Sequence, residues 1–239
     1  MERATSHLNK MRQLQPRSEM TWRLSGLIKA GLKDYYGALI DLTHYLKHDT
    51  ADVVCLRNRA IVRYRIDDYA GSIEDYKQLS KLLPNDFTID IAIAENYFLL
   101  HEDAKSIARL QDALTKNVNS TALKLALADK FIDMNRIKEA DDLVKDINKN
   151  VSHYWLGSFN QHFLDYLECR LYFAEGKTEK AKKEIEKKIS KYGDTDMLLL
   201  LRATVLISLN ELEQAKKDLL KLKARDYKPS KKMISKYSI

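Results

Sequence analysis

The sequence predicts an all-α solenoid of antiparallel helix pairs, and three observations lead to that fold class. Similar stretches recur with a period of 34 residues, broken once by seven extra residues. Glycine and proline are scarce, with 7 and 3 among 239 residues, which favours long helices and short turns. Apolar side chains within a stretch follow three- and four-residue steps, the period of a helix face. Such a period indicates one structural unit copied and stacked on its neighbours. The stretches begin at Glu19, Val53, Phe87, Thr121, His162 and Asp196.

The second stretch, which begins at Val53, shows what each repeat should contain. A first helix is expected to end near Arg65. Asp67 and Asp68 should make the turn, and an aspartate there should cap the second helix by accepting hydrogen bonds from unpaired amides. Pro84 should end that second helix before the next repeat begins.

Two arginines of this stretch stand at positions where apolar residues are more usual in a stacked helix pair. We expect Arg59 to pair with Asp41 or Asp75, and Arg63 to extend its charged end into solvent.

This pattern resembles the tetratricopeptide repeat. In that family a bulky and a small residue lie four apart in the first helix, and a small residue and two apolar residues mark the second. The small residues let helices approach closely and the bulky ones fill the seam. The resemblance covers residues 19–229 and implies a right-handed superhelix with the first helices on its concave side. First-helix residues that carry it are Trp22, Gly26, Ala94, Tyr97, Ala128, Phe131, Cys169, Tyr172, Ala203 and Leu206.

The repeats divide the chain into five parts. Residues 19–154 form four tandem repeats, 155–161 an aromatic insertion, and 162–229 two further repeats. Residues 230–239 are expected to cap the last repeat. Residues 1–18 resemble the second helix of a truncated repeat, so we expect the chain to be a piece of a longer protein. The apolar surface of that lone helix would favour a homodimer.

Charge and cysteine content limit the classes of function. The net charge of +7 is uneven, with +3 over residues 1–18, −2 over 19–161 and +6 over 162–239. In the basic C-terminal part lysines alternate with glutamates, which is typical of a solvated face, and nucleic-acid binding is not expected. No apolar run is long enough to cross a membrane. Cys55 and Cys169 lie in different repeats, and we expect both to be buried, which favours a reducing compartment such as the cytoplasm.

The sequence shows no catalytic, cofactor-binding or metal-binding motif. The scattered glycines form no phosphate-binding loop, and the histidines and cysteines lack zinc spacing. His44 and His48 are four apart, but we expect them on the outer surface of a second helix, where solvation is the simpler interpretation. The prediction is therefore a protein that is not an enzyme.

The resemblance implies a binding surface on the first helices, which in the family hold an extended peptide or a partner helix. Arginine and aromatic residues are frequent binding hot spots, so they head the candidates. The charges grade from basic in the first two repeats to acidic further along, which would orient a ligand. The candidates are Arg23, Arg57, Asn58, Ile61, Tyr64, Arg65, Glu95, Phe98, Asp129, Tyr166, Arg170 and Phe173.

The aromatic insertion leaves two interpretations open. Its side chains either fill a widened joint between repeats or form a ligand pocket. Ser158 should cap an unusually long helix that runs from 159 to about 174. The residues of the possible pocket are Tyr154, Trp155, Phe159 and Phe163.

The predicted function is a protein-protein interaction scaffold that binds a peptide or partner helix of unknown identity. Two alternatives remain: a regulatory or docking segment of a larger enzyme or secretion assembly, and nucleic-acid binding through the basic C-terminal part.

Overall fold

The computed structural model describes residues 18–150 and 157–237, and all regular structure in these ranges is helical. The chain divides into two compact units, Met1–Val118 and Asn119–Ile239, called here the N-terminal and C-terminal units. The described helices of the N-terminal unit are α2 (Glu19–Gly31), α3 (Tyr35–Tyr45), α4 (Val53–Arg65), α5 (Tyr69–Leu82), α6 (Phe87–Leu99) and α7 (Asp103–Lys116). Those of the C-terminal unit are α8 (Thr121–Asp133), α9 (Ile137–Asn150), α10 (Gly157–Ala174), α11 (Thr178–Tyr192), α12 (Asp196–Ser208), α13 (Leu212–Ala224) and α14 (Lys231–Lys236), with a 3-10 turn at Lys228–Ser230.

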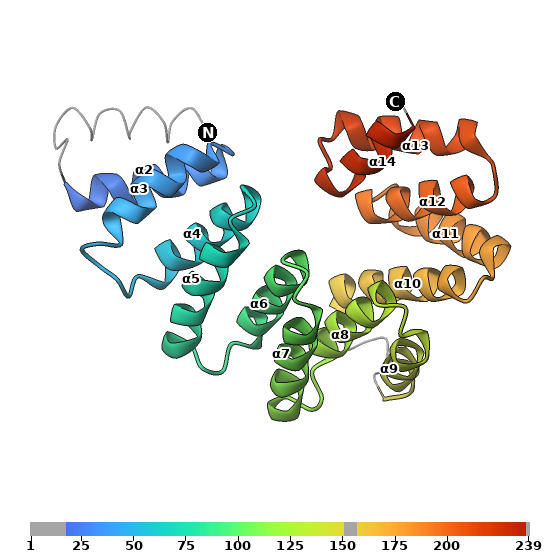
Figure 1. Cartoon of the computed structure of the whole chain (residues 1–239), viewed down its shortest axis with the longest axis horizontal. Coiled ribbons are helices and arrows are strands. Elements are labelled where there is room, and N and C mark those ends of the chain that lie inside the picture. Colours follow the sequence, from blue (N-terminus) through green and yellow to red (C-terminus); the bar gives the residue numbers. More distant parts are fainter. Residues whose placement is uncertain (1–17, 151–156, 238–239) are drawn as a thin grey trace. The chain divides into compact units, whose positions relative to one another are not determined.

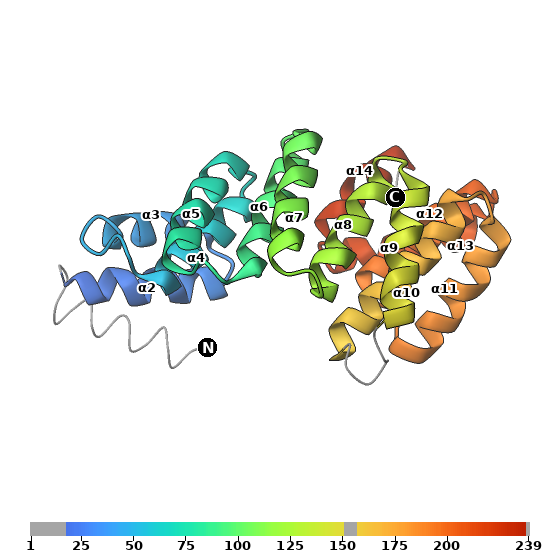
Figure 2. The ribbon, with the colours of Figure 1, turned by 90° about the horizontal axis from the view of Figure 1, so that it is seen from below.

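Within each unit the helices pack as pairs: α2 with α3, α4 with α5 and α6 with α7, then α8 with α9, α10 with α11 and α12 with α13 (Figures 1 and 2). Each pair is joined by a three-residue turn, so its two helices run antiparallel. The expected all-α helix-pair fold is confirmed. One detail was wrong: α10 begins at Gly157, so Ser158 lies inside the helix and is not its cap.

Aspartates start most helices of the N-terminal unit. Asp34 and Asp68 accept the amides of Gly37 and Gly71 at 3.0 and 2.9 Å. Asp52 accepts the amide of Cys55 at 2.9 Å. These bonds satisfy amides that have no partner inside the helix, so each helix begins at a defined residue.

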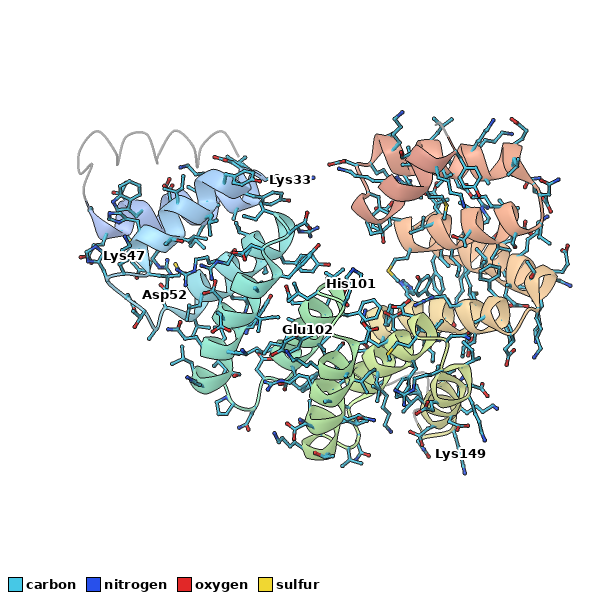
Figure 3. The ribbon with its side chains drawn as sticks, in the orientation of Figure 1. Lys33, Lys47, Asp52, His101, Glu102 and Lys149 are labelled. Carbon is cyan, nitrogen blue, oxygen red and sulfur yellow. The ribbon has the colours of Figure 1, made fainter. Side chains whose placement is uncertain are left out.

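The turn inside each pair places one residue in the left-handed region of backbone space. In the N-terminal unit these residues are Lys33, Asp67 and His101, with φ of 65°, 67° and 59°. Figure 3 labels Lys33 and His101 at the ends of α2 and α6. The corresponding residues of the C-terminal unit are Asn135, Gly176 and Asn210. A side chain in this conformation is strained, and glycine avoids the strain.

The cores form where small residues let first and second helices approach. A methyl group on Gly26 would come within 2.7 Å of Leu42 Cγ, so this position excludes any larger side chain without a shift. The equivalent residues of the later repeats are fully buried: Ala60, Ala94, Ala128, Cys169 and Ala203.

Both cysteines are free thiols in these cores, as expected. Burial raises the pKa of each thiol, Cys55 and Cys169, to about 12. Each therefore remains protonated at neutral pH and behaves as a small apolar side chain.

Buried aspartates on second helices tie the pairs together. Asp75 binds Arg59 through two hydrogen bonds, at 2.6 and 3.0 Å, which confirms one of the two expected partners. Arg63 was expected to reach solvent, but its Nη1 lies 3.0 Å from Asp75 Oδ2. Both arginines converge on one carboxylate because they lie one helical turn apart on the same face of α4.

The C-terminal end packs on the last helix pair. Met233, Ile234 and Tyr227 contact a buried cluster from α12 and α13 that includes Leu199 and Leu219. Among the described helices, none is both long enough and apolar enough to cross a membrane.

Candidate functional site

Two arginines predicted for the binding surface make structural contacts. Arg23 Nε lies 2.7 Å from Asp52 Oδ2, and Arg57 Nη2 lies 2.7 Å from Asp86 Oδ2. Each acceptor is the cap residue that precedes the next first helix. These guanidinium groups therefore link successive repeats, and their charge is already paired.

The pKa values of the acceptors reflect these contacts. Burial alone would raise the pKa of Asp52, but the hydrogen bonds from Arg23 and the Cys55 amide outweigh it and lower the pKa. The pKa of Asp86 is likewise lowered, because hydrogen bonds from Thr88 and Arg57 outweigh its burial. Both carboxylates are therefore charged at neutral pH.

A pocket of about 450 Å³ lies between α4 and α6 of the N-terminal unit, with one wall from α5. This volume is within the range of typical ligand clefts. Its wall is mostly apolar, with Ile61 41% exposed at the surface and Tyr76 only 7% exposed. The lining residues are Ile61, Tyr64, Arg65, Tyr76, Thr88, Ile91, Ala92, Glu95 and Asn96.

Packing and hydrogen bonds hold the wall of this pocket in place. The rings of Tyr64 and Tyr69 meet edge to face, with centroids 5.9 Å apart. Asn96 is 1% exposed and donates its side-chain amide to the Ala92 carbonyl at 2.7 Å. Burial raises the pKa of Tyr76, so its hydroxyl is neutral at physiological pH. A pocket with such fixed walls is largely preformed.

Arg65 differs from the other arginines in the described part of the N-terminal unit, residues 18–118. Those at positions 23, 57, 59, 63 and 109 all form ion pairs. Arg65 is exposed, lines the pocket, and has no ion pair within residues 18–150 and 157–237.

The other candidates on α4 and α6 have varied surroundings. Glu95 lines the pocket opposite α4. Asn58 donates its side-chain amide to the Val54 carbonyl at 2.8 Å and does not line the pocket. Phe98 is half-buried near the end of α6. The pocket thus brings together Ile61, Tyr64, Arg65 and Glu95 from the predicted surface.

In the C-terminal unit, the two predicted acidic residues of α8 lie within ion-pair distance of Lys130, and both also bind Arg170. Arg170 hydrogen-bonds Asp129, and its Nη2 lies 2.5 Å from Asp133 Oδ1. Burial would lower the pKa of Arg170, but the two carboxylates outweigh it and raise the pKa. Asp129 and Asp133, which were expected to form an acidic part of the binding surface, are therefore already paired with residues of the same chain.

The predicted aromatic residues of α10 pack beside this ion pair. The Arg170 guanidinium lies 5.7 Å from the ring centroid of Tyr166, and burial raises the pKa of that phenol. Phe173 packs against the buried cluster that contains Cys169 and Ile185. These contacts favour packing roles for Tyr166 and Phe173.

A second pocket, of about 230 Å³, lies where α10, α11 and α12 meet. Its wall contains Asp165, which accepts hydrogen bonds from Tyr192 at 2.5 Å and Gln161 at 3.1 Å and pairs with Lys188 Nζ at 2.7 Å. Burial opposes ionisation of Asp165, but Lys188 and Tyr192 outweigh it and lower its pKa. The lining residues are His162, Phe163, Asp165, Tyr166, Lys188, Tyr192, Thr195, Met197 and Leu198.

The possible aromatic pocket of the insertion is described only in part. Phe163 lines the second pocket, and its ring is stacked near Tyr166 with centroids 5.9 Å apart. Tyr154, Trp155 and the side chain of Phe159 lie outside the described residues.

The basic C-terminal part carries mixed charges. Lys182 pairs with Glu211 at 2.6 Å, and Arg225 binds Asp194 and Asp196 at 3.0 and 2.8 Å. No group of three or more histidine, cysteine or acidic residues in the described part of the chain could hold a metal ion. His44, considered above for metal, instead stacks on Trp22 with ring centroids 4.4 Å apart.

Comparison with known proteins gives the fold class. A tetratricopeptide repeat protein from Parabacteroides merdae ATCC 43184 matches with a TM-score of 0.78 and 21% identity, over 96% of this chain and 88% of that one. The APC/C hetero-tetramer Cut9–Hcn1 matches with a TM-score of 0.66 and 12% identity, over 99% and 45%. PilW, a type IV pilus biogenesis factor, matches with 0.60 and 17%, over 91% and 98%. No protein-family model and no curated protein matches the sequence. The chain therefore has the tetratricopeptide repeat fold.

The sequence indicated several residues of the α4–α6 pocket but not the pocket itself. Thr88, Ala92, Asn96 and Tyr76 complete its wall. Thr88 and Ala92 are too short to fill the space beside Ile61, and that shortness was the one signal available. The volume that short side chains leave depends on the helix spacing, which a single sequence does not give.

Proposed function

We propose that this chain is a non-catalytic interaction scaffold that binds a short extended segment of a partner protein, with an apolar side chain seated between α4 and α6. The observation that carries the proposal is the pocket there, whose wall combines apolar side chains such as Ile61 and Ile91 with Arg65, a cation that forms no ion pair within the described ranges. An apolar cleft with a few polar groups at its edge is the usual form of a binding site.

The competing surfaces have weaker grounds for this role. Arg23 and Arg57 would have to give up Asp52 and Asp86 to bind a ligand. Arg170 would likewise have to leave Asp129 and Asp133. Breaking such charged contacts carries a free-energy cost that subtracts from ligand affinity.

The same surface suits the second candidate function, a docking segment within a larger assembly. Cut9–Hcn1 is a hetero-tetramer of the APC/C, and PilW is a pilus biogenesis factor. These two neighbours support the broad class of scaffold rather than any named assembly. Nucleic-acid binding is not favoured, since acidic partners interrupt the basic residues of the C-terminal unit.

Peptide display tests the proposal directly. Random peptides would be selected on the wild-type chain, and the enriched peptides measured against Ile61→Glu and Ile40→Glu. Both isoleucines are exposed in the N-terminal unit, at 41% and 65%, but only Ile61 lines the pocket.

Ile61→Glu should weaken the selected peptides about ten-fold or more, because an apolar side chain would meet a carboxylate. Ile40→Glu should leave binding unchanged, and both variants should keep their helical circular dichroism. Equal binding to all three proteins, or no enrichment at all, would contradict the proposal.

A further inference from the structure

Arg65, in the wall of the α4–α6 pocket, forms no ion pair within the described residues, and this bears on what the partner must carry. Five of the six arginines in residues 18–118 are held by aspartates: Asp52, Asp86, Asp75, which takes two, and Asp90. The sixth, Arg65, has no ion pair within the described ranges, and it stands at the pocket wall.

From this arrangement we propose that the partner segment places an Asp or Glu side chain on Arg65, close in sequence to the apolar side chain that fills the pocket. The inference rests on the proposed function, since it specifies the chemistry of the segment bound at the same site. A guanidinium forms two parallel hydrogen bonds with a carboxylate, so it selects this group over a neutral amide.

The opposite wall gives the segment a direction. Glu95 on α6 lines the same pocket and would repel an acidic side chain placed beside it. The carboxylate therefore belongs on the α4 side, and a neutral or basic residue belongs on the α6 side. The apolar anchor lies between them, against Ile61, Ile91 and Ala92.

The same two charges disfavour a polyanion as the ligand. A nucleic-acid strand gains affinity by contacting several cations along its backbone. The lining of this pocket contains one arginine and one glutamate, so its formal charges sum to zero. A short peptide with a single carboxylate beside an apolar residue matches this wall.

Amide NMR spectra of the isotopically labelled full chain test the inference. The probes are short blocked peptides with a central Phe in a Gly/Ser background, carrying Glu, Gln or Lys two residues away on either side. Titration gives the affinity of each peptide, and the shifted amides locate the site. The Glu peptide of one orientation should shift amides of α4 and α6 and bind about two- to five-fold tighter than its Gln counterpart at low salt.

Two arginine variants sharpen the test. Arg65→Gln should abolish the preference for Glu over Gln while leaving the affinity of the Gln peptide unchanged, and Arg65→Glu should make the Lys peptide the tighter one. Arg57→Gln is the matched control: it lies on the same helix but is already paired, so the Glu preference should survive.

The outcomes separate the two proposals. Peptides that shift α4 and α6 amides with no difference among Glu, Gln and Lys would overturn the acidic-partner inference and leave the pocket assignment standing. Peptides that shift no amides of these helices would overturn both. A Glu preference that persists in Arg65→Gln would also overturn the inference, because another cation would then be responsible.

Discussion

The two units each contain a pocket beside their first helices. The pockets differ in whether the charged residues in their walls form ion pairs within the chain. In the C-terminal pocket Asp165 is bound by Lys188, Tyr192 and Gln161, so its polar wall is satisfied from within. In the N-terminal pocket Arg65 lacks any ion pair with the described residues. A satisfied charge stabilises the unit that contains it, whereas an unsatisfied charge is available to a partner. Pocket geometry alone does not distinguish these two roles.

The turns of the two units differ in a similar way. The C-terminal unit places Asn135, Gly176 and Asn210 in the left-handed conformation, and these residue types tolerate it. The N-terminal unit uses Lys33, Asp67 and His101 at the same place. Of these, lysine is the least suited, because its side chain cannot hydrogen-bond the local backbone.

The largest expected effect comes from breaking the ion pair of the C-terminal pocket. Asp165→Ala leaves Lys188 beside an apolar wall without its carboxylate. We expect a loss of about 2–3 kcal/mol in the free energy of unfolding, below the range for a fully enclosed pair because the Lys188 side chain remains 19% exposed. Urea unfolding followed by circular dichroism measures it. Arg65→Ala should cost less than about 0.5 kcal/mol, and an equal loss in both variants would remove the contrast between the pockets.

The next effect concerns the turns. Lys33→Gly should stabilise the chain by about 0.5–1 kcal/mol, since it relieves a φ of 65°. Gly176→Ala should destabilise by about 1 kcal/mol for the reverse reason. Thermal unfolding of both variants checks the pair.

Lys47→Gly is the control for Lys33→Gly. It replaces a lysine at the end of α3 that is not among the residues with positive φ, so it should lose stability (Figure 3). A gain at both lysines would show that side-chain removal, rather than backbone conformation, is responsible.

A smaller effect is the pH dependence of stability, which should differ between a variant of Arg57, which is paired, and a variant of Arg65, which forms no ion pair with the described residues. The lowered pKa of Asp86 means that the stability contributed by its contact with Arg57 is fully present above the ordinary aspartate value of 3.8. That stability is lost as the pH falls through the lowered pKa. Arg57→Gln should therefore cost about 0.5–1 kcal/mol at pH 7, and the cost should shrink as the pH falls below 3.8.

Arg65→Gln provides the comparison, because it should show no such pH-dependent difference from wild type. Unfolding curves across this pH range measure both variants. A constant difference for Arg57→Gln at all pH values would mean that the loss comes from packing and not from the ion pair.

Much of the fold was predictable because helix signals recur in register. A small residue recurs in every repeat, at Gly26 and its equivalents, and aspartates cap several helices, so the positions of the helices follow from counting. Helix boundaries were predicted less accurately where the 34-residue period is interrupted. At α10 the prediction missed the first two residues of the helix, because Ser158 was taken as a cap.

The site was less predictable because the type of a charged residue does not show which other residue of the chain it forms an ion pair with. Arg23 and Arg57 were predicted to bind a partner, but the structure shows that they bind Asp52 and Asp86. The prediction for Arg63 was wrong for the same reason, since Asp75 was considered only as one of two possible partners of Arg59. Recognising that Arg65 lacks an ion pair requires knowing the ion pairs of all the other described arginines.

The contact between Arg23 and Asp52 has a consequence for how such a chain can grow. Both residues lie within one 34-residue period, and Arg57 and Asp86 lie within the next. A gene duplication that copies a whole period copies both charges together, so the new repeat brings its own link to the following helix. Deleting a whole period removes both charges and leaves neither unpaired. Arrays assembled from copies of residues 53–86 should therefore lengthen without leaving either the arginine or the aspartate of this link unpaired.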